Sequence, residues 1–116
     1  MALHSHTDEL YNRANVLPRI GFDTVAFRED FMTEGAEDGA YLSDASLVQE
    51  MIARYESRDP SKPIFLYGLS MENHQLYTTE KYSYPSGIDV QCDKLSQEDK
   101  AILDSLVLGL HHADAS

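Results

Sequence analysis

The feature that most constrains this chain is a run of six residues at positions 64–69, with the sequence IFLYGL, that contains no charged side chain. A strand with one face in water alternates apolar and polar residues, whereas a strand buried on both faces of a parallel sheet is continuously apolar. The run therefore predicts a buried strand in a parallel sheet. A sheet of this kind needs helices on both of its faces.

Three helical patterns can supply that cover. Residues 8–17 repeat apolar side chains on one helical face, and Pro18 is predicted to end this helix. A second helix is predicted to begin after Ser43 as its N-cap and to end before Asp59. A third begins with a capping box formed by Ser96 and Asp99 and continues toward the C-terminus. The apolar faces predicted for the second and third helices are Leu47, Val48, Met51, Ile52 and Tyr55, and Ile102, Leu103, Leu106, Val107 and Leu110.

The remaining segments complete an alternating order of helices and strands. Residues 24–27 predict a short strand, residues 34–39 a polar loop, and residues 78–94 a long irregular loop. The tyrosines at 77, 82 and 84 either cover a substrate or pack this loop, and packing is the favoured interpretation. The order predicts an α/β fold with few parallel strands covered by helices. Because a sheet usually has about five or six strands, the chain is interpreted as a fragment of a larger domain.

Composition excludes several classes of protein. The formal net charge of -11 comes from 20 acidic and 9 basic residues, and it would repel a nucleic acid backbone. Cys92 is the single cysteine, so no internal disulfide or multi-cysteine zinc site can form. The longest apolar run, residues 63–71, is shorter than the roughly 20 residues that span a bilayer. The segment is expected to be soluble and to bind no nucleic acid.

Candidate ligand-binding residues lie near the N-terminus. His4 and His6 would face one side of an extended segment and could ligate a metal, but the nearby sequence lacks the further ligands of a metallohydrolase. A polar, partly frayed N-terminus is therefore favoured, and no metal ligand is assigned. Tyr11 and Arg13 together could hold a phosphate or sulfate, because an Arg fork binds such anions bidentately.

A second group of candidates follows the buried run. In open α/β sheets, ligand-binding groups collect at the carboxyl ends of the strands. The segment 69–74 occupies that position, and it contains Asn73 and His74. His74 could donate to an anionic oxygen or transfer a proton, and Asn73 could donate an amide hydrogen.

These motifs, in this order and spacing, resemble the middle of lipoteichoic acid synthase-like phosphoglycerol transferases, which belong to the sulfatase and alkaline phosphatase superfamily. The resemblance covers nearly the whole chain. The residues that carry it are Leu3-His4, Tyr11-Asn12-Arg13, Leu17-Pro18, Gly21-Phe22-Asp23, Ser43-Asp44 and Ser70-Met71-Glu72-Asn73-His74. The resemblance implies that residues 1–116 are the central segment of a sulfatase-like catalytic domain with an alkaline-phosphatase-like sandwich fold.

The resemblance also implies a function. The parent would be a membrane-anchored enzyme at the extracellular face of the bacterial cell membrane, moving phosphoglycerol from a lipid or polymer substrate through a phospho-threonine with manganese or magnesium. By position, His4, Tyr11, Arg13 and His74 would bind the substrate, with Arg13 and His74 facing the phosphate. His6 departs from the Asp or aromatic residue of the family and is not among these contacts.

The catalytic centre of the family is missing from this segment. The nucleophilic threonine and an acidic metal ligand lie N-terminal to the matching region in the family, and an Asp-His metal pair lies C-terminal to it. The segment is therefore expected to contain no catalytic residue, metal ligand or cofactor, and to be inactive by itself. His111 and His112 match no ligand motif, and their expected role is to complement the dipole at a helix C-terminus.

Two alternative functions remain open at this point. A sulfatase or phosphonate-ester hydrolase would share the fold and the anion-binding residues. A small acidic interaction module would need no catalytic centre. The truncated sheet also predicts exposed apolar surface, and hence self-association of the segment.

Overall fold

The computed structural model describes residues 1–74 and 76–115, apart from the side chain of Asp38. Three short strands, β1 (Ala2–His4), β2 (Val25–Ala26) and β5 (Tyr67–Leu69), form a sheet in the order β2-β1-β5. Both neighbours pair with β1 in parallel, with Leu3 opposite Ala26 on one side and Gly68 on the other. The prediction of an α/β fold with few parallel strands is confirmed.

The central strand is the N-terminal segment that the sequence predicted to be polar and partly frayed. Ala2, Leu3 and His4 are almost completely buried. The prediction was wrong because β1 is only three residues long, too short to show a pattern, and because its neighbours cover it on both edges. Its position fixes His4, the last residue of β1, and the start of the segment that carries His6.

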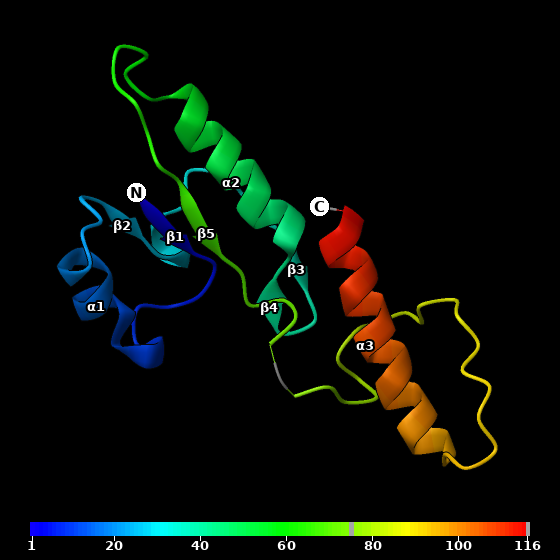
Figure 1. The fold of residues 1–116 in the computed structure, drawn as a ribbon. Helices are drawn as coiled ribbons and strands as arrows, with labels where there is room; N and C mark the ends of the chain where they lie inside the picture. Colours follow the sequence, from blue (N-terminus) through cyan, green and yellow to red (C-terminus); the bar gives the residue numbers. More distant parts are fainter. Residues whose placement is uncertain (75, 116) are drawn as a thin grey trace.

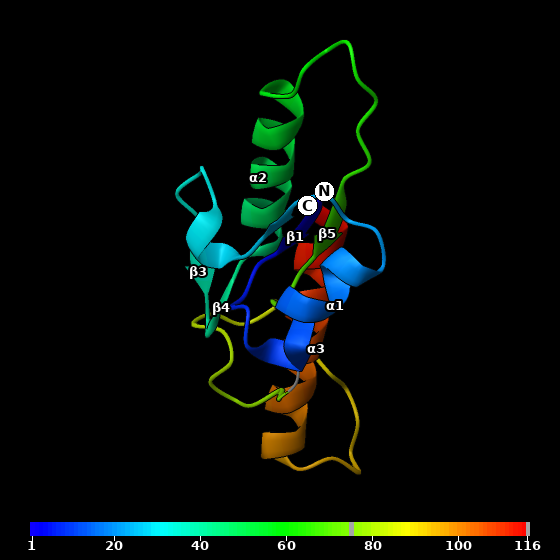
Figure 2. The same ribbon diagram turned by 90° about the vertical axis from the view of Figure 1, so that its left-hand side faces the viewer.

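Two helices lie on different sides of this sheet (Figures 1 and 2). Helix α1 (Arg13–Arg19) follows β1 and contacts β2, whereas α2 (Asp44–Glu56) precedes β5 and contacts β5 and β1. Leu3, Ala26 and Leu47 form the core on the α2 side. A Cβ atom at Gly68 would lie 2.5 Å from Met51 Sδ, so strand and helix approach closely here, and a larger residue would force the Met51 side chain to move.

Helix α1 begins later than the sequence predicted. Residues Leu10–Asn12 form a 3-10 turn (η1), in which Tyr11 and Asn12 have positive φ angles of 56° and 54°. A left-handed backbone interrupts an α-helix, so the predicted helix over residues 8–17 cannot form. Pro18 lies inside the last turn of α1, and the helix ends at Arg19.

The prediction that the run at 64–69 is buried on both faces is wrong. The strand covers only Tyr67–Leu69, and the side chains of Phe65 and Tyr67 are 70% and 39% exposed. Phe22 stacks on both rings, at 6.0 and 5.7 Å between centroids. Since α1 packs beside β2, it leaves the face of β5 that carries these rings largely open to solvent.

This open face leads to a prediction about association. Phe65, Tyr67 and Ile20 form an exposed apolar patch beside an edge strand, and we expect the chain to self-associate through it. Sedimentation velocity should show a mass that rises with concentration, and Phe65→Ser should reduce that rise. The control substitution Ile52→Ser, at a 52% exposed site on α2, should leave it unchanged. A monomer at all concentrations would contradict the prediction.

The second helix has the predicted start but a different buried face. Ser43 caps α2, with its Oγ accepting a hydrogen bond from Ser46 N at 3.2 Å. Ile52 and Tyr55, predicted to face the core, are about half exposed. The helix buries Glu50 and Asp44 together with Leu47, so polar contacts set its orientation as much as its apolar residues do.

The third helix, α3 (Gln97–Ala115), also has the predicted start but a different buried face. Its capping box is confirmed, because Asp99 N donates to Ser96 Oγ at 3.1 Å and Ser96 N donates to Asp99 Oδ2 at 3.2 Å. Leu110, predicted to be on the apolar face, is 59% exposed. The helix buries Ser105, Leu108 and Gly109, and Ser105 Oγ donates to Thr78 O.

The loops were predicted in part. Residues 78–94 contain no helix or strand, as predicted. The predicted loop at 34–39 instead starts a small antiparallel hairpin of β3 (Glu37–Asp38) and β4 (Tyr41–Leu42), which follows the 3-10 turn η2 (Arg28–Asp30). Within the described ranges, every helix is too short or too polar to reach across a bilayer.

Candidate anion site at the carboxyl end of the sheet

The strand order reverses at β1, whose carboxyl end lies beside that of β5. The chain passes from β1 to β2 on one side of the sheet, and then crosses to β5 on the other side of β1. Ligands of open α/β sheets bind where the strand order reverses in this way. The segments that leave β1 and β5 here begin with Ser5 and Ser70, and α2 begins nearby, since Asp44 N donates to a side chain of the segment after β5.

His4 is fixed at this edge in a neutral form. Its ring is fully buried, and Nδ1 donates a hydrogen bond to Leu69 O at 3.0 Å, which joins the ends of β1 and β5. Burial lowers the pKa of His4, the hydrogen bond to Leu69 opposes this, and the nearby Arg13 and His6 lower the pKa further. Arg13 Nη1 lies 2.5 Å from Nε2 and 3.0 Å from Nδ1 of this ring. Because Nδ1 carries the proton, Nε2 is the ring nitrogen that can accept from Arg13.

Arg13 is held in place without a carboxylate. It is the first residue of α1, and its guanidinium lies over the ring of Tyr11, 5.1 Å from the centroid. In the part of the chain that the structure describes, no Asp or Glu lies within ion-pair distance of Arg13. Tyr11 is 68% exposed, so the cation stands at a surface that a ligand can reach. A fixed cation with no internal counter-ion suits an anionic ligand.

His74 lies farther along the same edge. A row of rings connects it to His4, with centroids 6.1 Å apart for His4 and His6, 5.7 Å for His6 and Tyr41, and 6.1 Å for Tyr41 and His74. The structure therefore brings His4, Tyr11 and Arg13 into contact and places His74 beyond His6 and Tyr41. Convergence of Arg13 and His74 on one anion stays a prediction.

Two neighbours of His74 have structural roles. The Asn73 amide, predicted as a donor to an anion, instead donates to Gly109 O of α3 at 2.7 Å. Glu72 is buried and accepts hydrogen bonds from Asp44 N and His112 Nδ1, each at 2.5 Å. His112 lies in the last turn of α3, as predicted, and also anchors this helix through Glu72. These contacts hold the segment after β5 against both helices.

Sequence reasoning missed Tyr41 and Lys81. Tyr41 belongs to β4, a strand that the sequence did not predict, and its ring packs against His6 and His74. Lys81 is 9% exposed and lies among the rings of Tyr41, Tyr77 and Tyr82. The tyrosines close to position 81 in the sequence could have indicated that aromatic rings surround Lys81. The favoured interpretation, that these tyrosines pack the loop, holds for Tyr77 and Tyr82, which pack around this lysine.

Two buried polar atoms near this edge have no hydrogen-bond partner among the described residues, namely Ser5 Oγ and Asp44 Oδ1. Ser5 directly follows β1, and Asp44 is the first residue of α2. A buried polar group without a partner costs about 1–3 kcal/mol, and such groups concentrate at functional sites. Their position supports the carboxyl edge as the binding site.

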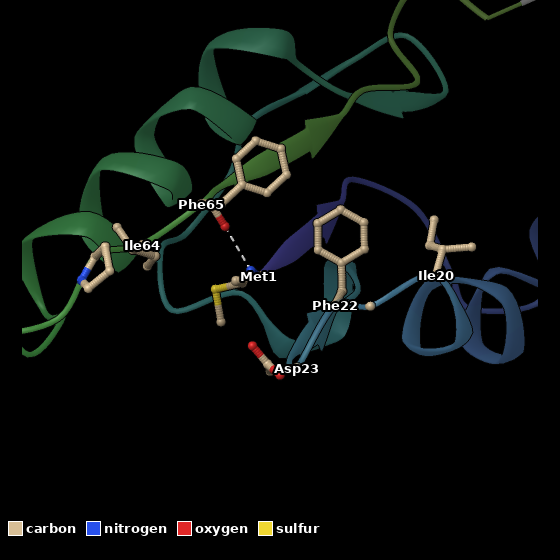
Figure 3. A pocket seen from close by; sticks show the side chains of 8 residues that line it. Met1, Ile20, Phe22, Asp23, Ile64 and Phe65 are labelled. Atoms are coloured by element: carbon tan, nitrogen blue, oxygen red, sulfur yellow. Dashed lines mark hydrogen bonds between the residues drawn. The ribbon is translucent and has the colours of Figure 1, made fainter.

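A separate hollow of about 500 Å³ lies near the amino ends of β1 and β5 (Figure 3). Phe22, Ile64 and Phe65 line it together with Met1, whose amino group donates to Phe65 O at 2.8 Å. It contains none of the predicted binding residues. In residues 1–74 and 76–115, no three His, Cys, Asp or Glu side chains are arranged to hold a metal ion.

The chain is similar to a protein of polysaccharide biosynthesis. It is 26% identical over 113 residues to "Capsular polysaccharide biosynthesis protein RkpI" of Rhizobium meliloti (strain 1021). The alignment covers 97% of this chain and 21% of that relative, so the chain spans about a fifth of the relative's length. No protein-family profile and no solved structure matches the chain.

Proposed function

We propose that this chain is the substrate-binding segment of a phosphoglycerol transferase that acts on cell-envelope lipids or polymers outside the bacterial cytoplasm. The similarity to a capsular polysaccharide biosynthesis protein supports an envelope-biosynthetic role in general. The observation that carries the finer proposal is the pair of His4 and Arg13, in which a neutral, buried imidazole holds a guanidinium that no carboxylate neutralises in the described residues.

In this proposal each residue has a defined task. Arg13 binds two oxygens of the phosphate, because a guanidinium presents parallel N–H donors. His4 accepts from Arg13 and orients its fork, and Tyr11 forms an aromatic wall beside the glycerol. His74 approaches the phosphate from the end of β5. Transfer of the phosphoryl group requires a nucleophile and a divalent cation, manganese or magnesium, and the described residues do not fit such a centre.

The test is to titrate glycerol 3-phosphate into the 116-residue chain and to monitor its binding by NMR. We expect the His4 and Arg13 resonances to shift, and Arg13→Ala to weaken binding by about tenfold or more, because a charge-assisted hydrogen bond contributes roughly 1.5–3 kcal/mol. Arg58→Ala is a matched control, since Arg58 also lies over a tyrosine ring, that of Tyr55, at 3.5 Å. It should change the affinity by less than about twofold.

The same titration separates the alternatives. Methyl sulfate bound more tightly than glycerol 3-phosphate would favour a sulfatase. Binding of neither anion would favour an interaction module and would contradict the proposal. Turnover of phosphodiester by this chain alone would also contradict it, because the nucleophile and metal ligands are expected elsewhere in the enzyme.

A further inference from the structure

The hollow at the amino ends of β1 and β5 lies at the opposite end of the sheet from the anion site. It has a volume of about 500 Å³, and its lining combines the rings of Phe22 and Phe65 with the carboxylate of Asp23 (Figure 3). Apolar walls with a few polar groups are typical of sites for small ligands. The proposed phosphate site uses none of these residues.

Phe22 is held at the hollow by the end of α1. Gly21 has a φ of 107°, its N–H donates to Pro18 O at 3.2 Å, and Phe22 N donates to Leu17 O at 3.3 Å. This pair of hydrogen bonds around a glycine with positive φ is a Schellman motif, which ends a helix and fixes the direction of the chain after it. A Cβ atom at Gly21 would meet no atom within 4 Å, so the space beside this turn is open.

Phe65 and Tyr67 bring two more rings to the same side. They are two positions apart on an extended chain, so their side chains point the same way. The chain is fixed to β1 here, because Met1 N donates to Phe65 O at 2.8 Å and Tyr67 N donates to Met1 O at 3.0 Å. The ring plane of Phe22 is inclined by 13° to that of Phe65 and by 28° to that of Tyr67. We call these three rings the aromatic platform.

The aromatic platform is open to solvent although the backbone fixes it. Phe65 is 70% exposed and Tyr67 39%, and Figure 3 shows the ring faces of Phe22 and Phe65 turned in the same direction. Exposed apolar patches with a polar rim mark binding sites for ligands or partners. Nearly parallel ring faces fit a flat ligand better than they fit an amphipathic helix, which needs a groove.

A pyranose sugar matches this surface in shape and in chemistry. A sugar ring can present a face of C–H groups, whose partial positive charge is attracted to the negative face of an aromatic ring. The centroid separations of 6.0 and 5.7 Å are comparable with the length of one sugar unit, so neighbouring rings can contact successive units. Asp23 is exposed, and among the described residues no cation pairs with it. Its carboxylate can accept hydrogen bonds from sugar hydroxyls, whereas it would repel an anionic lipid surface.

We propose that the aromatic platform and Asp23 form a binding site for a neutral saccharide. This site goes beyond the proposed function, because it lies at the other end of the sheet from Arg13 and requires no phosphate. In an enzyme that acts on cell-envelope polymers, it would hold a sugar segment of a polymer away from the reacting phosphate.

The experiment titrates cellotriose and maltotriose into the 116-residue chain by NMR, with sorbitol as a control that has hydroxyl groups but no sugar ring. At least one trisaccharide should shift the ring resonances of Phe22, Phe65 and Tyr67 with millimolar affinity, and sorbitol should not. Phe65→Ala should weaken this binding by about fivefold or more, because one stacking surface is lost, and Phe65→Tyr should retain it. Tyr55→Ala removes a ring that is 49% exposed on α2 and should change the affinity by less than about twofold.

Platform resonances that neither trisaccharide shifts, or that sorbitol shifts equally, would overturn the inference. A second copy of the chain is the competing occupant, because the predicted self-association uses Phe65 and Tyr67 as well. A bound trisaccharide should therefore reduce the rise of mass with concentration in sedimentation velocity. Unchanged association together with unshifted rings would assign the platform to the second copy alone. Phe65→Ala should leave the response to glycerol 3-phosphate unchanged, so failure of the saccharide site and failure of the proposed function are distinguishable.

Discussion

Replacement of Glu50 by alanine should lower the free energy of unfolding by about 3–5 kcal/mol, because it removes the anionic partner of a buried ion pair. The Glu50 side chain is fully buried in α2. One carboxylate oxygen accepts from Met32 N and Thr33 N, both at 2.9 Å, and the other accepts from Arg54 Nε at 2.7 Å. Alanine would leave these donors without partners. Urea denaturation followed by circular dichroism measures the loss.

Two further variants identify the cause of this loss. Glu50→Gln keeps one acceptor oxygen and removes the charge, and it should cost less, about 1–3 kcal/mol. Glu56→Ala removes a carboxylate from the exposed C-terminal end of the same helix, and should change stability by less than about 0.5 kcal/mol. A Glu50→Ala chain as stable as the Glu56→Ala chain would show that the buried carboxylate contributes nothing.

Glu50 should also make the fold sensitive to acid. Desolvation raises its pKa, but the hydrogen bonds from Met32, Arg54 and Thr33 together outweigh it, so the pKa lies below its ordinary value of 4.5. A carboxyl group with a lowered pKa stabilises the fold above its unfolded pKa, and this contribution is lost as the pH falls through its folded pKa. The wild-type chain should therefore lose stability below about pH 4.5, and Glu50→Gln should lose less over the same range.

The sequence predicted those parts of the fold that depend on local signals. The caps at Ser43 and Ser96 are set by side chains within three residues, and both are in place. The strand around Val25 and the absence of regular structure over residues 78–94 also follow from local composition. Each of these features depends on residues close together in the sequence.

The errors arise where distant residues decide the outcome. The exposure of Tyr67 depends on the position of α1 beside β2, and the burial of Glu50 depends on backbone donors at Met32 and Thr33. A charged residue in a helix pattern normally indicates the solvent face, so the pattern placed the buried face of α2 incorrectly. The left-handed turn at Tyr11 has no strong local signal, because a bulky residue rarely has positive φ.

The sequence predicted which residues form the candidate site better than it predicted how their side chains are arranged. The resemblance selected His4, Tyr11 and Arg13, and the structure brings these three side chains into contact. It could not show that His4 is neutral and serves Arg13, since that depends on its hydrogen bond to Leu69 across the sheet. Tyr41 and Lys81 were missed because their proximity comes from contact between the hairpin and the long loop.

The most direct test of the site uses the two residues predicted to face the phosphate. If this chain belongs to a larger enzyme as proposed, Arg13→Ala and His74→Ala in that enzyme should each lower kcat/KM by about tenfold or more, since each removes a charge-assisted hydrogen bond of roughly 1.5–3 kcal/mol. Metal content and fold should be unchanged. His111→Ala, at an exposed site on α3, is the matched control and should retain wild-type kinetics.

The double variant decides whether both residues act on one phosphate. The row formed by His4, His6, Tyr41 and His74 runs along a single edge of the sheet, so a phosphate bound by Arg13 can lie on the side toward His74. If both side chains bind the same phosphoryl group, loss of one loosens the geometry that the other needs. The double variant should then lose less than the product of the two single losses, by a coupling of roughly 0.5–3 kcal/mol. Strictly additive losses would assign His74 to a separate contact, and wild-type kinetics in either single variant would exclude that residue from the phosphate site.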